Sequence, residues 1–318
     1  MALRCAILDD YQNVALKLAD WSAFRDKVAL TVFDVPFADA AAAIAALQDF
    51  DIVCAMRERT PFTAEVLSAL PKLKLLLTSG MRNASFDLAT ARERNVVVCG
   101  TGNVGNPTVG ITIGLMLELT RRIGFENARM KAGASWQITV GEDVEGKTLG
   151  IVGLGKLGAR VAAVGQALGM QVKAWSSNLT VEACAAAGVA YATKEELFAT
   201  SDVITIHLVL SERSRSLVGA ADLARMKPTA YLINTARGPI VDEAALLEAL
   251  GERRIAGAGL DTFWQEPLPV DHPLRRLDNV VLTPHLGYVT AENYRRYYED
   301  MVEDIAAWLA GAPVRQLG

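Results

Sequence analysis

Hydrophobic and polar positions follow two alternating patterns over the first hundred residues. Short apolar runs rich in Val, Ile and Leu predict five strands, at 3–8, 28–33, 52–55, 73–78 and 96–98. Amphipathic or Ala-rich stretches between them predict helices at 38–47, 63–70 and 86–94. Strands that alternate with helices indicate a parallel sheet, and five strands suit a small doubly wound domain.

The same alternation returns in the second half of the chain. A loop rich in Gly, Asn and Pro at 101–107 precedes a long helical pattern from 108 to about 131. Six further strands are predicted at 148–152, 171–175, 203–208, 230–234, 255–260 and 280–282. Helices are predicted at 156–168, 181–187, 195–199, 220–226 and 243–250, with a final one at 291–309. These elements predict a second parallel α/β domain.

Composition narrows the class of protein. With 318 residues, 51% hydrophobic and 21% charged, the chain is expected to form about two globular domains. The net charge of −4, without a basic block, argues against a nucleic-acid partner. The N-terminal apolar run is too short for a signal peptide, and no apolar helix approaches the length of a membrane span. Four scattered Cys without metal-ligand spacing predict a cytoplasmic protein and no metal site.

A glycine-rich turn carries the first chemical signal. Gly153, Gly155 and Gly158 form the pattern G-x-G-x-x-G directly after a predicted strand and at the start of a predicted helix. The first Gly permits a tight turn, the second allows a pyrophosphate to approach the backbone, and the third lets helix and strand pack closely. With Lys156 and Leu157, these residues are the candidate dinucleotide-binding turn.

The choice between NAD and NADP stays open. An NAD site normally has an acidic residue about 20 residues after the turn, at the end of the next strand. Here that strand is followed by Ser176, Ser177 and Asn178, with neither an acid nor an Arg. These side chains can donate hydrogen bonds to a phosphate or to a ribose hydroxyl.

Three polar segments follow predicted strands of the second domain: 234–238, 260–267 and 283–287. In a parallel sheet the carboxyl ends of the strands meet along one edge, where ligands bind. The segments are therefore expected to converge there, although they are separate in the sequence.

Through these three segments, the chain resembles the D-isomer specific 2-hydroxyacid dehydrogenase family. The resemblance also rests on Trp136, on 146–150 leading into the glycine turn, on 226–228, and on 272–274. It implies a Rossmann-type doubly wound parallel sheet domain at 101–289, which binds NAD or NADP. It also implies a discontinuous flavodoxin-like α/β substrate domain at 1–100, completed by 290–318. A homodimer formed through the cofactor domain is the usual assembly of the family.

By resemblance, Arg237, Glu266 and His285 take the family's catalytic roles. A carboxylate beside an imidazole stabilises its protonated form, and His is suited to proton transfer near neutral pH. A planar guanidinium suits a substrate carboxylate or carbonyl. The resemblance also places five further residues at the cofactor: His207, Thr235, Ala236, Asp261 and Gly287.

Alternatives remain for the other two histidines. His207 has a second interpretation as a packed residue at the end of a strand, and His272 is expected to be structural or solvated.

The candidate substrate loop departs from the family pattern. Gly80, Met81 and Arg82 stand where a Gly-Val-Gly-like turn is usual, and main-chain N–H groups after Gly80 are expected to bind the substrate carboxylate. Arg82 is either an added substrate cation or a solvent-facing side chain. The charged stretch 57–60 after the third strand is either part of the site or a surface turn.

The function predicted is an NAD(P)-dependent oxidoreductase that interconverts a small 2-oxo acid and its D-2-hydroxy acid. One alternative is an NADPH-preferring glyoxylate or hydroxypyruvate reductase, which the missing acid makes plausible. Another is a binding protein that senses nucleotides on the same fold without catalysis. The three family residues are present, whereas a catalytically dead homologue is expected to lack at least one of them.

Overall fold

The computed structural model describes residues 2–318, which form two compact units. Unit 1 runs up to Gly105 and is completed by Thr290–Gly318, and unit 2 is Asn106–Val289. The chain thus leaves unit 1 at Gly105 rather than at residue 100. The extra residues stay with unit 1 because their backbone is bonded to the last helix, α12 (Ala291–Leu309). The N–H of Gly102 donates to Asp300 and that of Val104 donates to Asn293, at 2.7 and 2.8 Å.

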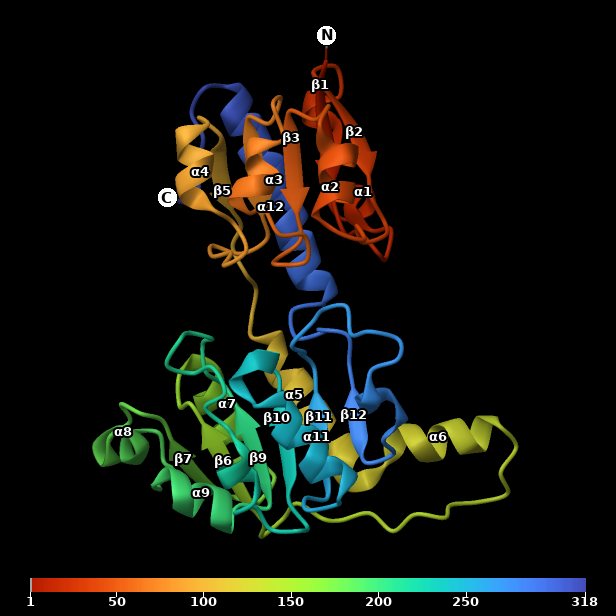
Figure 1. The fold of residues 1–318 in the computed structure, drawn as a ribbon, viewed down its shortest axis with the longest axis vertical. Helices are drawn as coiled ribbons and strands as arrows, with labels where there is room; N and C mark the ends of the chain where they lie inside the picture. The colour runs from red at the N-terminus through yellow and green to blue at the C-terminus, as the bar shows by residue number, and fades with distance from the viewer. Residues whose placement is uncertain (1) are drawn as a thin grey trace. The chain divides into compact units, whose positions relative to one another are not determined.

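Unit 1 is built on a five-stranded parallel sheet with the order β2-β1-β3-β4-β5 (Figure 1). This is the flavodoxin-like order. The strands are β1 (Leu3–Ile7), β2 (Val28–Val32), β3 (Ile52–Ala55), β4 (Leu75–Thr78) and β5 (Val97–Gly100). Every residue of β3 and β4 is buried, as expected for central parallel strands covered on both faces.

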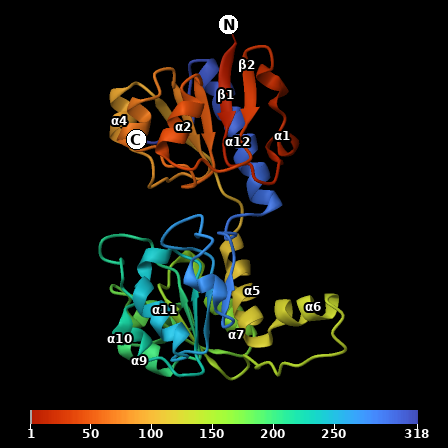
Figure 2. The same cartoon turned by 45° about the vertical axis from the view of Figure 1, so that its right-hand side comes forward.

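Helices pack against both faces of this sheet. The short helices are α1 (Ala15–Leu18), α2 (Ala40–Leu47), α3 (Ala64–Ser68), α4 (Leu88–Glu93) and the 3₁₀ helix η1 (Trp21–Phe24). Apolar side chains of α2, α3 and α4 pack with Val53 and Leu76 in one core. The long helix α12 contacts β4, α1 and η1, and Figures 1 and 2 show it running along the sheet. Asp39, Thr63 and Asp87 each accept a main-chain N–H and so define where α2, α3 and α4 begin.

Unit 2 contains a seven-stranded parallel sheet with the order β12-β11-β10-β9-β6-β7-β8. The six strands from β8 to β11 follow the Rossmann order, and β12 adds a seventh strand beside β11. The strands are β6 (Thr148–Val152), β7 (Gln171–Trp175), β8 (Ala190–Tyr191), β9 (Val203–Ile206), β10 (Tyr231–Asn234), β11 (Gly257–Leu260) and β12 (Val280–Leu282). The sequence predicted six strands and missed β8, because two exposed residues give no hydrophobic run.

Two cores lie against this sheet. One joins it to α5 (Pro107–Arg121) and α7 (Lys156–Ala167), and the other joins it to the helices that follow β8. The remaining helices are α6 (Ile123–Lys131), α8 (Val181–Ala186), α9 (Lys194–Thr200), α10 (Ala220–Leu223), α11 (Glu243–Gly251), and the 3₁₀ helices η2 (Gly238–Ile240) and η3 (Pro273–Arg276). The predicted fold class is therefore confirmed: two parallel α/β domains, one of them discontinuous in sequence.

The single long helix predicted from 108 to about 131 is wrong. It is divided into α5 and α6 at Arg122, which has a left-handed backbone with φ +51°. Both carboxylate oxygens of Glu118 accept the N–H of Gly124 and so cap the start of α6. Periodicity alone could not reveal this break, because the apolar pattern continues through it.

Two smaller observations complete the fold. The four cysteines are buried free thiols. In the part of the chain that the structure describes, no helix is both long and apolar enough to cross a membrane.

Candidate active site

The glycine-rich turn has the geometry that its sequence predicts. Gly153 follows β6 with φ +101°, and a Cβ there would lie 2.9 Å from the carbonyl oxygen of His207. At Gly158 a Cβ would lie only 2.1 Å from the carbonyl oxygen of Gly153. A Cβ at Gly155 would meet open space, just where α7 begins. The turn therefore leaves its middle glycine and the helix N-terminus open, which fits a dinucleotide pyrophosphate.

The end of β7 carries no charge of its own. Ser176, Ser177 and Asn178 follow Trp175, and Ser177 and Asn178 are exposed. The ammonium of Lys194 lies 5.7 Å from the Trp175 ring, but it is already paired with Asp222 at 2.8 Å. This edge thus offers hydroxyl and amide groups rather than a carboxylate.

His207 lies at the end of β9, with its backbone against the glycine turn. Its ring Nε2 is 3.0 Å from the Thr205 hydroxyl, and burial lowers the pKa of the imidazole to about 4. The side chain is therefore neutral at physiological pH. Its main-chain N–H donates to the carbonyl of Val152, so the residue shapes the wall of the turn through its backbone.

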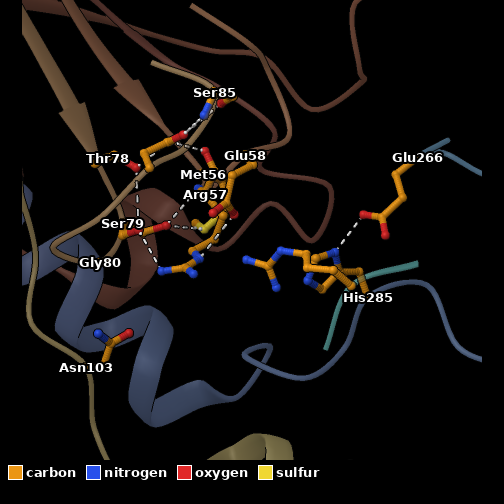
Figure 3. Close-up of polar contacts among 12 residues, drawn as sticks. Met56, Arg57, Glu58, Thr78, Ser79, Gly80, Ser85, Asn103, Glu266 and His285 are labelled. Carbon is orange, nitrogen blue, oxygen red and sulfur yellow. Dashed lines mark hydrogen bonds and ion pairs between the residues drawn. The ribbon is translucent and has the colours of Figure 1, made fainter. Parts of the chain in front are cut away.

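His285 and Glu266 form the closest acid–base pair of the predicted site residues. His285 Nδ1 lies 2.6 Å from Glu266 Oε2 (Figure 3). The other carboxylate oxygen of Glu266 accepts the N–H of Phe263 at 2.8 Å. Burial alone would raise the pKa of Glu266, but the hydrogen bond and charge of His285 outweigh it and lower that pKa. Because Glu266 holds Nδ1, the Nε2 atom of the ring is left for chemistry.

Arg237 belongs to the same group of loops. Its Nη1 donates to the carbonyl of Ala236 at 2.8 Å, and its charge contributes to the lowered pKa of Glu266. Asn234 fixes the backbone around Arg237. Its side-chain NH₂ group donates to the Arg237 carbonyl, and its side-chain oxygen accepts the N–H of Ala236. Thr235 is buried, with its hydroxyl 2.9 Å from that of Thr112 on α5. The sequence pattern places Asn234 in the polar segment 234–238 without giving it a role, and it does not mark Thr112.

Asp261 holds the loop that carries His285. It is fully buried, and its carboxylate accepts the Thr283 hydroxyl at 2.6 Å and the N–H groups of Leu286 and Gly287 at 2.7 and 2.8 Å. Burial raises the pKa of Asp261, although these hydrogen bonds oppose the shift. The sequence suggested a cofactor contact for Asp261, whereas its carboxylate already takes three donors from the chain itself.

Both main-chain polar groups of Gly287 are hydrogen-bonded within the chain. Its N–H donates to Asp261, and its carbonyl accepts the Thr108 hydroxyl at 2.9 Å. A Cβ at this position would lie 3.1 Å from the Asp261 carboxylate. Any cofactor contact at Gly287 therefore has to come from close approach rather than from a free N–H.

The candidate substrate loop of unit 1 follows β4. Gly80 has φ +87°, and its N–H donates to the Thr101 hydroxyl at 2.8 Å. That N–H is therefore not open to a substrate, whereas Met81 and Arg82 lie exposed on the loop. Asn83 braces the loop by donating to the carbonyl of Arg57 and to the Thr78 hydroxyl.

His272 has a structural place, as expected. Its Nε2 lies 2.8 Å from Glu243, and its Nδ1 accepts the N–H of Leu274 at the start of η3. Within residues 2–318, no group of three or more His, Cys, Asp or Glu is placed to hold a metal ion.

Comparisons with known proteins agree with this architecture. The model of the D-isomer specific 2-hydroxyacid dehydrogenase NAD binding domain matches residues 113–287. A glyoxylate reductase from Korarchaeum cryptofilum is 37% identical over 258 residues, covering 79% of this chain and 77% of that protein. A D-3-phosphoglycerate dehydrogenase from Synechocystis sp. is 36% identical over 264 residues, covering 82% of this chain and 47% of that protein. The crystal structure of a phosphoglycerate oxidoreductase from Vibrio cholerae o395 has a TM-score of 0.92 and 32% identity, covering 98% of this chain and 100% of that chain. The chain belongs to the D-isomer specific 2-hydroxyacid dehydrogenase family, whose members use an NAD-type cofactor.

Proposed function

We propose that this chain reduces a small 2-oxo acid to its D-2-hydroxy acid with NADH or NADPH, and catalyses the reverse oxidation. The observation that carries the proposal is the His285–Glu266 pair, with its 2.6 Å contact and lowered carboxylate pKa. It lies in the same unit as a glycine turn whose Gly153 and Gly158 leave no room for a side chain.

The residues of the turn fit the cofactor. Gly153, Gly155 and Gly158, with the N–H groups of Lys156 and Leu157 at the start of α7, would hold the pyrophosphate. When bound, the reduced nicotinamide supplies the hydride that is transferred to C2 of the 2-oxo acid. Thr235, Ala236 and the backbone of His207 are assigned to the walls of this site.

The protein's own chemistry is proton transfer and orientation. As the C2 carbonyl is reduced, its oxygen gains negative charge and takes the proton from His285 Nε2. Glu266 stabilises the imidazolium that donates this proton, and in the oxidative direction the neutral ring accepts it back. Arg237 is assigned to bind the substrate carboxylate or carbonyl with its planar guanidinium, which orients C2.

An activity panel tests the proposal. Purified protein is given glyoxylate, hydroxypyruvate, pyruvate and bulkier 2-oxo acids, each with NADH and with NADPH, and oxidation of the cofactor is followed. Reduction of at least one acid is expected, with loss of activity in Arg237→Ala mainly through a raised KM. Cofactor binding without turnover on the whole panel would refute the proposal and favour a nucleotide-sensing binding protein.

We further propose that the end of β7 accepts the 2′-phosphate of NADP as well as the free hydroxyl of NAD. Ser176, Ser177 and Asn178 offer hydrogen-bond donors there, and no carboxylate among them repels a phosphate. Ser176→Asp is expected to lower kcat/KM for NADPH by about tenfold or more relative to NADH. Gln171→Glu adds the same charge at the other end of β7 and serves as the control. An unchanged cofactor ratio in Ser176→Asp would contradict this assignment.

A homodimer is proposed from an apolar surface on unit 2. Six large apolar residues on α6 and in the segment after it are exposed, namely Ile123, Phe125, Met130, Trp136, Ile138 and Val140. The exposed fraction reaches 97% at Val140, and such a concentration marks a protein interface. Light scattering is expected to give twice the monomer mass for the unaltered protein, and the monomer mass for Ile138→Glu combined with Val140→Glu.

A further inference from the structure

Two threonine hydroxyls in the first turns of α5 bond to loops that follow strands of unit 2. The hydroxyl of Thr108 donates to the carbonyl of Gly287 at 2.9 Å, and that of Thr112 lies 2.9 Å from the hydroxyl of Thr235. Thr108 and Thr112 are four residues apart, so their side chains lie on the same face of the helix. The helix packs against β10 and β12, the strands that lead into these two loops (Figure 1).

The number of protons assigns the donor in each of these hydrogen bonds. Thr112 has one hydroxyl proton, and its Oγ1 lies 2.9 Å from the carbonyl oxygen of Thr108, which can only accept. The Thr112 proton therefore goes to that carbonyl, and the Thr235 hydroxyl donates to Thr112. Hydrogen bonds thus connect Thr235, through Thr112 and Thr108, to Gly287.

Each end of this connection lies next to a residue of the proposed chemistry. Thr235 is two residues before Arg237, and Gly287 is two residues after His285. Thr112 and Thr235 are only 1% and 7% exposed, so water cannot readily replace a hydrogen bond lost between their hydroxyls. Removal of one hydroxyl is therefore felt by the loop that it holds.

We propose that Thr108 and Thr112 are positioning residues that hold the loops of the proton donor and of the substrate-binding arginine on one helix. This inference rests on the proposed function. A helix is a more precise support than a loop, because its own hydrogen bonds fix each turn relative to the next. Thr108 acts through Gly287 on the loop of the proton donor, so its loss is expected to lower kcat. Thr112 acts through Thr235 on the guanidinium that orients the substrate, so its loss is expected to raise KM.

Steady-state kinetics on three valine variants test the assignment, since each variant replaces a hydroxyl by a methyl group of similar size. Thr108→Val is expected to lower kcat about fivefold at a nearly unchanged KM for the 2-oxo acid, the effect of one net hydrogen bond. Thr112→Val is expected to raise that KM about fivefold at a nearly unchanged kcat. Thr120→Val is the matched control, because Thr120 is also buried on α5 and its hydroxyl bonds to carbonyls of α5 itself. It is expected to leave both constants nearly unchanged.

Serine variants separate the loss of a hydroxyl from a loss of packing. Thr108→Ser and Thr112→Ser keep the hydroxyl and are expected to retain the kcat and KM of the unaltered protein. Serine variants as impaired as the valine variants overturn the proposal. The same change of both constants in Thr108→Val and Thr112→Val also overturns it, because general destabilisation gives no such split. When Thr112→Val does not fold, Thr108→Val, at a half-buried position, decides alone.

Hydrogen–deuterium exchange separates this inference from the proposed function. When no 2-oxo acid is reduced, the proposed function fails, and exchange of the main-chain N–H groups in the two loops decides whether the threonines hold them. Faster exchange of 285–289 in Thr108→Val, and of 235–238 in Thr112→Val, than in Thr120→Val supports the inference. Equal exchange of these segments in the three variants contradicts it.

Discussion

The strongest prediction concerns Asp261, because one buried carboxylate fixes the loop of the proposed proton donor. Asp261→Asn keeps the shape of the side chain and replaces one carboxylate oxygen by an NH₂ group. The amide oxygen can still accept from Thr283 and Leu286, but the NH₂ group then faces the N–H of Gly287. One hydrogen bond to a charged group is lost and a donor is left facing a donor, which costs about 1.5–3 kcal/mol.

The electrostatics of the site offset part of this loss. Burial raises the pKa of Asp261 above its ordinary value, so the ionised form is more costly in the folded chain than in the unfolded chain. The stability that this group contributes is fully present below the unfolded pKa and is lost as the pH rises through the folded pKa. A neutral Asn removes that penalty at neutral pH, so the net destabilisation is expected to stay below about 3 kcal/mol.

Activity is expected to suffer more than stability. A displacement of His285 of about 1 Å is enough to lower kcat by about a hundredfold. Differential scanning calorimetry is expected to show a Tm lower by several degrees, and steady-state kinetics to show the loss in kcat. Asp278→Asn is the matched control, because Asp278 is an exposed acid of the same unit that pairs with Arg253. If Asp261→Asn kept the kcat of the unaltered protein, the loop-holding role would be refuted.

Three further changes test other parts of the structure. His285→Ala is expected to lower kcat by orders of magnitude and leave the cofactor Kd nearly unchanged in fluorescence titration; full activity would remove its assignment as proton donor. Gly158→Ala is expected to destabilise the protein by about 3 kcal/mol or more in urea unfolding, because its Cβ meets the carbonyl of Gly153, whereas Gly155→Ala is expected to weaken cofactor binding at unchanged stability. Burial raises the pKa of Asp304 to about 7, so its favourable contribution is present below pH 4 and is lost between about pH 4 and 7. Asp304→Asn is therefore expected to be more stable than the unaltered protein by roughly 1–2 kcal/mol at pH 8 and to lose that advantage below about pH 4, and an advantage that does not change with pH would contradict the shift.

The elements and catalytic motifs of the chain could be predicted because local patterns determine them. Strands such as β3 and β4 are continuous apolar runs. The G-x-G-x-x-G pattern between a strand and a helix is characteristic of a dinucleotide-binding turn. The convergence of Glu266 and His285 followed from the shared edge of a parallel sheet, and their contact confirms that they meet. Their catalytic roles, in contrast, stay predictions until the variants are measured.

The features that the sequence did not reveal depend on particular hydrogen bonds and backbone conformations rather than on the apolar pattern. The helix break at Arg122 depends on a cap by Glu118 and on a left-handed backbone, neither of which changes the apolar pattern. The Gly80 N–H donates a hydrogen bond to the Thr101 hydroxyl, which joins the ends of β4 and β5. No local sequence rule predicts this pairing. The part of Asp261 in holding the loop was also not visible, since its three donors come from residues 22 to 26 positions later, and its cofactor contact stays a prediction.

In each unit, a left-handed residue that is not Gly stands two or three residues after a strand. Arg57 after β3 and His285 after β12 both have positive φ angles although neither is Gly. Such a conformation costs about 1–2 kcal/mol per residue and persists only where the surroundings hold it. Ser79 and Asn83 hold Arg57, and Asp261 holds the loop of His285. In each unit, hydrogen bonds thus keep a strained backbone in place so that a charged or titratable side chain is fixed at the end of a parallel strand, and removing these partners is expected to cost activity before it costs the fold.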